Sequence, residues 1–127
     1  MPGSSTHATA LALHTLIDRY FRQRETGLFY SVVDPYDPGL INLPSRHAIE
    51  NDIPNSNGWT TPIEDSALLS SQHLITQVLR HRVTREQTHA DDARRIAAGL
   101  LRLQAASRIP GFVPRGVLPD GKTHYRN

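Results

Sequence analysis

The sequence predicts an all-α fold, and three observations support this prediction. Apolar residues recur at three- and four-residue steps in three separate segments, which is the spacing of amphipathic helices. Most of the nine prolines and eight glycines lie outside these segments, between residues 27 and 62 and after residue 107. The 127 residues suffice for one modest core. We therefore expect one partial domain, 1–127, with helices at about 5–24, 62–82 and 85–106 and long loops at 27–61 and 107–127.

The first predicted helix carries a single apolar stripe that includes Leu13 and Ile17. Arg22 and Arg24 stand near its end, where the helix dipole favours cations. Gly27 follows, in the place where a glycine in the left-handed conformation closes a helix.

The second predicted helix begins with the clearest local signal in the chain, "TPIE" at 61–64. In this pattern Thr61 is the N-cap, Pro62 the first helical residue and Glu64 the third, which together form a capping box with proline in its preferred place. "TREQ" at 84–87 has the same capping spacing and predicts the start of the third helix. The short connection between the second and third helices predicts an antiparallel hairpin.

The second helix is almost free of charge. From Pro62 to Leu79 the only charged residues are Glu64 and Asp65, both in the first predicted turn. One side is apolar, and the opposite face is small or neutral; the residues of that opposite face are Ser66, Ser70 and Gln77. Such a helix is expected to have neighbours on more than one side, whereas the third helix is apolar inward and charged outward.

Composition excludes several classes of function. The pI is near 9.4, but the net charge is only +2, and the arginines are dispersed, so no nucleic-acid partner is expected. The absence of cysteine excludes disulfides and thiolate metal sites. None of the seven histidines belongs to the i, i+4 pattern with a carboxylate that a helical zinc site requires, and His14 with Asp18, one helical turn apart, gives only two ligands, so we expect no metal and no cofactor. No apolar run has the length of a membrane span, and a cytoplasmic location without a membrane partner is expected.

Two stretches carry a resemblance to a known family. "GWTTPIEDS" at 58–66 and "GFVPRGVLPDGKTHYRN" at 111–127 resemble the N-terminal part of six-hairpin glycosidase-like proteins. These proteins have (α/α)6 toroid folds and include unsaturated glucuronyl hydrolases and uncharacterised carbohydrate-active proteins. The resemblance runs from about Leu28 to Asn127 and covers the first quarter to third of a toroid. It implies a truncated chain that is inactive alone, because later inner helices complete such active sites.

The resemblance places Glu64 and Asp65 at the mouth of the ring, as candidate catalytic residues. A pair of carboxyl groups is what glycoside cleavage needs. The alternative is structural: Glu64 belongs to the capping box, and acidic residues are favoured in any first helical turn.

Further candidates would bind substrate. Trp59 offers an apolar ring face on which a sugar can stack, and Asn57 an amide for its hydroxyls, although Trp59 is equally a staple between loop and helix. Arg115 suits a bidentate grip on the carboxylate of an acidic sugar. The terminal loop adds Asp120, His124 and Tyr125, of which Asp120 is also explained by the turn "PDG".

The sequence thus supports two functional hypotheses. In the first, the chain is an N-terminal piece of a hydrolase-like toroid that contributes loops to an oligosaccharide-binding mouth, with uronic-acid sugars among the candidate ligands. In the second, it is a small helical interaction module that self-associates or binds a protein partner, because an exposed apolar helix face usually marks an interface. Both hypotheses predict that the chain associates, with itself or with the remaining toroid segments.

Overall fold

The computed structural model describes residues 3–34, 36–37, 41, 43, 45–51, 53, 62–107 and 109–118. The helices are α1 (Gly3–Phe21), α2 (Arg46–Glu50), α3 (Ser66–Thr84) and α4 (Gln87–Ala106). Apart from isolated bridge residues, among them the pair Arg22 and Phe29, all regular structure in these residues is helical, which confirms the all-α class. None of the described helices is long and apolar enough to cross a membrane.

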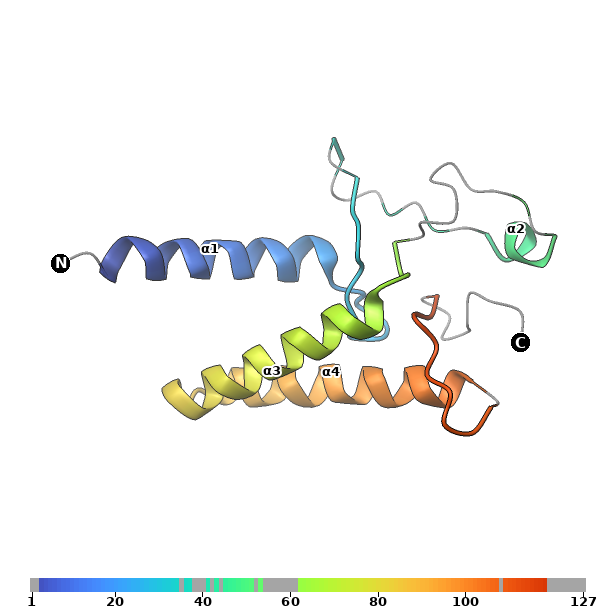
Figure 1. Cartoon of the computed structure of the whole chain (residues 1–127). Helices are drawn as coiled ribbons and strands as arrows, with labels where there is room; N and C mark the ends of the chain where they lie inside the picture. Colours follow the sequence, from blue (N-terminus) through green and yellow to red (C-terminus); the bar gives the residue numbers. More distant parts are fainter. Residues whose placement is uncertain are drawn as a thin grey trace.

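The predicted hairpin is confirmed. Helices α3 and α4 run antiparallel and pack against each other, while α1 lies beside them on the α3 side (Figure 1). Arg85 makes the reversal possible with a φ of 63°, in the left-handed region. Its N–H donates to the carbonyl of His81 at 2.9 Å and so ends α3.

The predicted capping of α4 by Thr84 is wrong. Thr84 is the last residue of α3, and the N-cap of α4 is Glu86, which makes no side-chain capping bond. The Thr84 hydroxyl instead donates to the Arg80 carbonyl at 3.0 Å and accepts from the Glu86 N–H at 3.2 Å. The threonine therefore stabilises the connection and not the start of the next helix.

The predicted start of the second helix at Pro62 is also wrong. Residues 62–65 form a turn, and α3 begins at Ser66 with Asp65 as an N-cap residue that makes no side-chain capping bond. Thr61 lies outside the described residues. The turn differs from the prediction because tertiary contacts use its backbone: the Ser31 hydroxyl donates to the Pro62 carbonyl at 2.8 Å.

The first helix ends earlier than predicted, at Phe21 rather than near Arg24. Gly27 does take the predicted left-handed conformation, with a φ of 76°, but in a turn beyond the helix. This turn packs against α4, where a Cβ on Gly99 would overlap the carbonyl oxygen of Thr26. Arg22, predicted to serve as a cation at the helix end, is buried.

The apolar core lies where the N-terminal end of α3 meets the C-terminal end of α4. One cluster joins Leu28, Leu103 and Val117, and a second joins Tyr30, Ile63 and Leu118. The terminal segment is held closely, because a Cβ on Gly116 would overlap the backbone oxygen of Ile63. The core therefore fixes the loops that precede and follow the hairpin onto its base.

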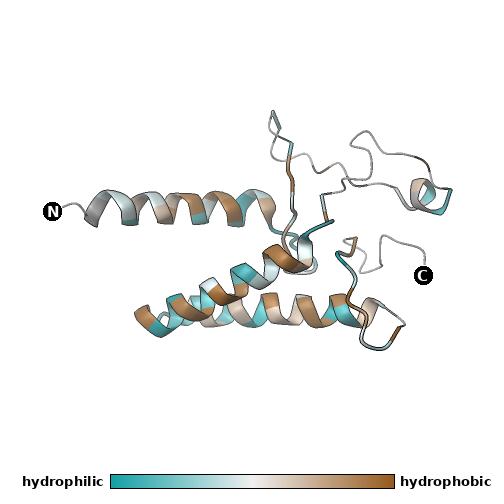
Figure 2. Ribbon diagram, viewed as in Figure 1, coloured by the Kyte–Doolittle hydropathy of each residue, from teal (hydrophilic) through white to brown (hydrophobic). Residues whose placement is uncertain are grey.

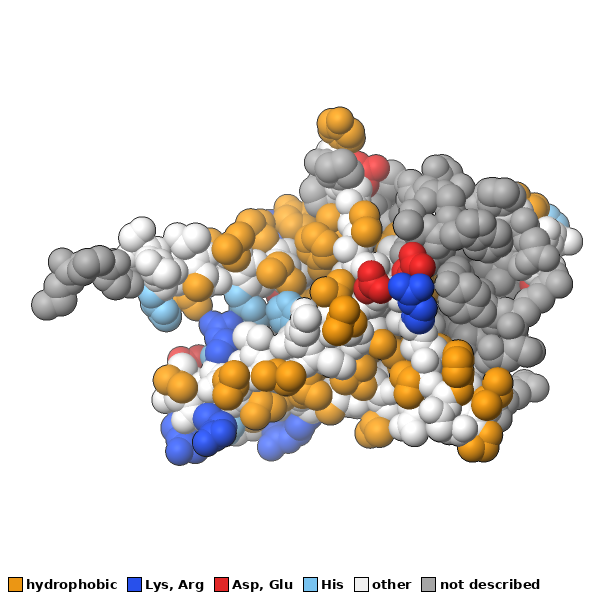
Figure 3. All heavy atoms as spheres, viewed as in Figure 1, with side chains coloured by type: hydrophobic (Ala, Val, Ile, Leu, Met, Phe, Trp, Pro, Cys, Tyr) orange, Lys and Arg blue, Asp and Glu red, His pale blue; other side chains and the backbone are white. Residues whose placement is uncertain are grey.

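Helix α3 buries its polar face and exposes its apolar face. Ser66, Ser70 and Gln77 are 0% exposed. On the opposite side Leu68 is 59%, Ile75 60% and Leu79 53% exposed. Hydrophobic residues recur along the visible side of α3 in Figure 2, and Figure 3 shows their side chains in a row on the surface. We call Leu68, Ile75 and Leu79 the α3 apolar face.

Candidate functional site

Three of the residues nominated from the sequence come together at the start of α3. Arg115 Nη1 donates to Glu64 Oε1 at 2.7 Å, and Nη2 donates to Asp65 Oδ1 at 2.8 Å. Arg115 Nε also donates to the Glu64 carbonyl at 3.0 Å. Arg115 thus binds the carboxylates of Glu64 and Asp65 in its own chain, one through each Nη atom, in the forked geometry that suits a guanidinium.

The same contact caps the helix. The Arg115 carbonyl accepts from the N–H of Ala67 at 3.0 Å, which satisfies one of the amides that every helix leaves free in its first turn. Residues some 50 positions apart in the chain therefore form one unit, with Asp65 and Arg115 each about half exposed. This arrangement holds both carboxylates in fixed positions at the surface, where their remaining oxygen lone pairs can accept hydrogen bonds from a ligand.

The other nominated residues lie outside the described part of the chain. These residues are Asn57, Trp59, Asp120, His124 and Tyr125.

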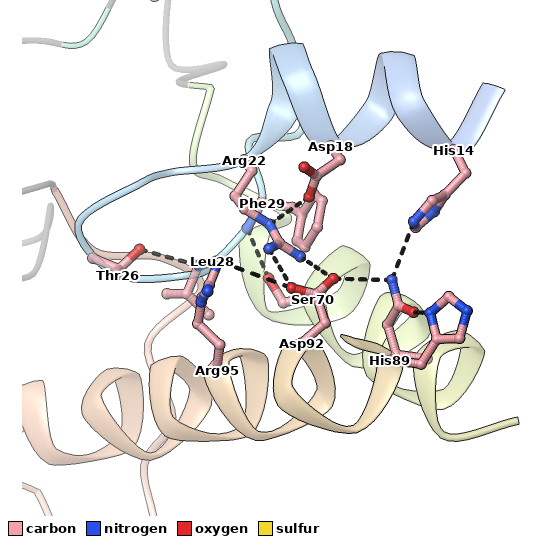
Figure 4. Close-up of polar contacts among 11 residues, drawn as sticks. His14, Asp18, Arg22, Thr26, Leu28, Phe29, Ser70, His89, Asp92 and Arg95 are labelled. Carbon is pink, nitrogen blue, oxygen red and sulfur yellow. Dashed lines mark hydrogen bonds and ion pairs between the residues drawn. The ribbon is translucent and has the colours of Figure 1, made fainter. Parts of the chain in front are cut away.

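A second set of polar side chains joins α1 to the hairpin, and sequence reasoning missed it. We call it the polar cluster: its members are His14, Asp18, Arg22, Gln77, His89 and Asp92. Figure 4 shows Arg22 of the turn after α1 pointing at Asp92 of α4, with Asp18 above it. The Arg22–Asp92 pair is bidentate, at 2.6 and 2.9 Å, and Arg22 Nε lies 2.8 Å from Asp18 Oδ1. The Arg22 side chain is only 2% exposed.

Gln77 ties the three helices together at the centre of the polar cluster. Its Nε2 donates to Asp92 Oδ2 at 3.0 Å and lies 3.3 Å from Nε2 of His14. Its Oε1 lies 3.0 Å from Nδ1 of His89, which must carry the proton for this bond to form. By the same reasoning His14 Nε2 accepts, which is the role of a neutral imidazole.

Burial sets the protonation of the groups at this contact. It lowers the pKa of His14, with help from the charge of Arg80. It also lowers the pKa of His73, which stacks on Phe29 with ring centroids 4.0 Å apart. Burial acts to raise the pKa of Asp92, but the hydrogen bonds and charge of Arg22 outweigh it, so the pKa of Asp92 lies below its ordinary value.

Two grooves flank the contact between α1 and the hairpin. One has a volume of about 540 Å³ and is lined by the members of the polar cluster other than Arg22, together with other side chains that include Arg19, Arg24 and Arg95. The other, of about 350 Å³, is mainly apolar and lies between Ile17 and Phe21 of α1 and Leu69 of α3. Both are open surface grooves, and the charges of the first are largely paired within the chain.

The polar cluster performs a structural task. Two carboxylates, of Asp18 and Asp92, pair with a guanidinium that has almost no contact with water, and Gln77 holds Asp92 in place; an unpaired buried charge would be costly. Within the described residues, no three histidine or acidic side chains are placed to hold a metal ion. A signal was present in the sequence, since His14, Asp18 and Arg22 follow each other at steps of four residues. Their partners on α3 and α4 were not identifiable from that spacing.

Comparisons of this chain with protein-family models, with curated proteins and with solved structures find no match.

Proposed function

We propose that this chain is a helical module that self-associates through the α3 apolar face. The observation that carries the proposal is that α3 turns its polar side inward and its apolar side outward. It buries polar side chains and leaves Leu68, Ile75 and Leu79 more than half exposed. A helix in a finished fold turns its apolar side inward. An apolar row on the surface of a monomer typically marks a contact with another protein surface.

The energetics favour a weak and reversible complex. Moving a half-exposed leucine or isoleucine side chain out of water contributes about 1 kcal/mol. A symmetric contact between two copies doubles the number of such side chains, but association costs at least about 4 kcal/mol in lost freedom of motion. The complex is therefore expected to depend on protein concentration.

Size-exclusion chromatography with light scattering tests the proposal. We expect the wild-type chain to have a mass above the 14.2 kDa of one copy at high concentration. The double variant Leu68→Glu/Ile75→Glu should be monomeric and still helical by circular dichroism. The matched control is Ala98→Glu/Gln104→Glu, which adds the same charge at exposed positions of α4 and should leave association unchanged.

We further propose, as a second candidate function, that the start of α3 contributes to an oligosaccharide-binding mouth, as the resemblance to six-hairpin glycosidase-like proteins implies. The convergence of Glu64, Asp65 and Arg115 supports it, because fixed carboxylates at a surface can accept hydrogen bonds from sugar hydroxyls. Two carboxylates and one guanidinium leave a net negative charge, which favours neutral sugars over uronic acids.

A glycan array that includes neutral and uronic-acid oligosaccharides tests this candidate. We expect a neutral ligand whose binding is lost in Glu64→Gln/Asp65→Asn and kept in Gln87→Glu, an exposed substitution at the far end of the hairpin. Absence of binding to every oligosaccharide on the array would remove the sugar site.

A further inference from the structure

We infer that two copies of α3 pair antiparallel about a two-fold axis, an inference that rests on the proposed self-association and specifies its geometry. The evidence is a row of residues along α3 with alternating steps of three and four, the spacing of a coiled-coil seam. We call this row the α3 seam. Its members are Asp65, Leu68, Gln72, Ile75, Leu79 and Arg82.

The α3 seam lies on the surface along its whole length. Each of its six residues is exposed, including the polar ones at its centre and ends. All of them stand on the side opposite Ser66, Ser70 and Gln77, which face the interior. A second helix can therefore lie along Leu68, Ile75 and Leu79 without displacing a buried contact of the first, while Asp65 at the end of the seam also binds Arg115.

The spacing of the α3 seam is symmetric about its midpoint, and its two leucines stand at equivalent positions. Asp65 and Arg82 are equally far from the midpoint of the row, and so are Leu68 and Leu79. An antiparallel pair of helices places such positions opposite each other, because one chain is read forward and its partner backward. Leucine then packs on leucine in two symmetric layers, and Gln72 meets Ile75 near the axis. A two-fold interface requires this kind of self-complementary pattern.

Charge distinguishes the antiparallel pair from a parallel one. Opposite α3 seams would bring the Asp65 carboxylate of each copy near the Arg82 guanidinium of the other, at both ends of the contact. A parallel pair would set Asp65 against Asp65 and Arg82 against Arg82, which is repulsive. The dipoles of the two helices also attract each other only when the helices run antiparallel.

At one end of the α3 seam Asp65 Oδ1 is already bound by Arg115, so the partner's Arg82 would approach the other carboxylate oxygen of Asp65. Between Ser66 and Leu79, α3 carries no charged side chain apart from histidine, and the positions that flank the α3 seam include the small residues Ser71 and Thr76. Small flanking residues let two helices approach closely. Gln72 at the centre lowers the affinity but restricts the register, as a polar residue in a seam does.

Cysteine cross-linking tests the inference cleanly, because the chain has no cysteine of its own. In the antiparallel pair, positions 68 and 79 of different copies face each other, within reach of a disulfide. Two copies of position 68 lie about 16 Å apart along the helix axis. A mixture of Leu68→Cys and Leu79→Cys should therefore give a cross-linked dimer, and neither variant alone should do so.

The outcomes separate this inference from the proposed self-association. Cross-linking of Leu68→Cys alone and of Leu79→Cys alone would overturn the antiparallel register while leaving self-association in place. A wild-type dimer with no cross-link in any combination would show that α3 does not face α3. A wild-type chain that stays monomeric would overturn both.

A charge variant gives a second readout that needs no covalent bond. Arg82→Glu should weaken dimerisation by about tenfold, because it replaces two attractions by two repulsions at an exposed site. Arg82→Lys should keep most of the affinity, since it keeps a cation opposite Asp65, which stays unchanged because it also binds Arg115. Equal weakening by Arg82→Lys and Arg82→Glu would contradict the pairing of Arg82 with Asp65.

Discussion

The two faces of α3 reverse the usual relation between polarity and burial. On the inner face the fully buried Ser70 accepts the N–H of Phe29 in the segment after α1, and the fully buried Gln77 contacts His14 of α1 and Asp92 of α4. The outer face carries Leu68, Ile75 and Leu79 in water. The two faces of this helix therefore bind their neighbours by different forces. The inner face uses directional hydrogen bonds, and the outer face offers hydrophobic surface to a partner.

The largest loss of stability is expected from a substitution of Arg22, whose ion pairs join α1 to α4. Arg22→Ala removes the counter-ion that Asp18 and Asp92 share and should destabilise the fold by about 3 kcal/mol, because it leaves the Asp92 carboxylate, only 20% exposed, without this partner. Arg24→Ala, an exposed neighbour, should change stability by less than about 0.5 kcal/mol. Urea unfolding of the two variants makes the measurement. Equal stability would mean that the polar cluster does not hold α1.

A smaller loss of stability is expected from a substitution of Ser70. Its hydroxyl accepts the N–H of Phe29 at 2.9 Å in a buried place. Ser70→Ala leaves this amide without a partner and should cost about 1 to 3 kcal/mol. The adjacent Ser71 bonds only to the carbonyl of Ala67 in its own helix, and Ser71→Ala should be nearly neutral. If the two substitutions cost the same in thermal unfolding, the inner face is not specifically polar.

The smallest expected effect is a decrease in the stability of the fold as the pH falls. His14 and His73 have lowered pKa values in the folded chain, so the folded state binds fewer protons than the unfolded state. Their contribution to stability is complete above the ordinary histidine pKa of about 6.5 and is lost as the pH falls below it. Asp92 acts in the same direction at still lower pH.

Melting temperatures between pH 7 and 5 check this expectation. The wild-type chain should melt at lower temperature as the pH falls, and His14→Gln/His73→Gln should show a flatter profile. If the melting temperature of the double variant fell as steeply with pH as that of the wild-type chain, groups other than His14 and His73 would cause the pH dependence. The groups that surround the two imidazoles are Asp18, Arg22, Arg80, His89 and Asp92.

Periodicity predicted the three long helices and their order, because it reflects local spacing. It missed the five-residue α2, which lies inside the predicted loop 27–61, because so short a helix shows too little of the repeat. The hairpin also followed, since only Arg85 and Glu86 separate α3 from α4. Both capping boxes failed for a common reason. At "TPIE" and "TREQ" the side chains and backbone make other bonds, with Arg115 in the first case and within the hairpin connection in the second.

The contacts between distant residues were beyond sequence reasoning. Glu64, Asp65 and Arg115 were each nominated, but nothing local indicated that they bind one another across some 50 positions. Arg22 and Asp92, 70 positions apart, were not recognised as partners, because each has an ordinary role on the surface of its own helix. A buried ion pair is determined by tertiary packing and not by spacing.

Sedimentation equilibrium of the wild-type chain over about a hundredfold range of concentration tests the central claim most directly. We expect a reversible equilibrium between a species of 14.2 kDa and one of twice that mass, abolished by Leu68→Glu/Ile75→Glu. A single species of 14.2 kDa at every concentration would contradict the claim that the α3 apolar face is an interface.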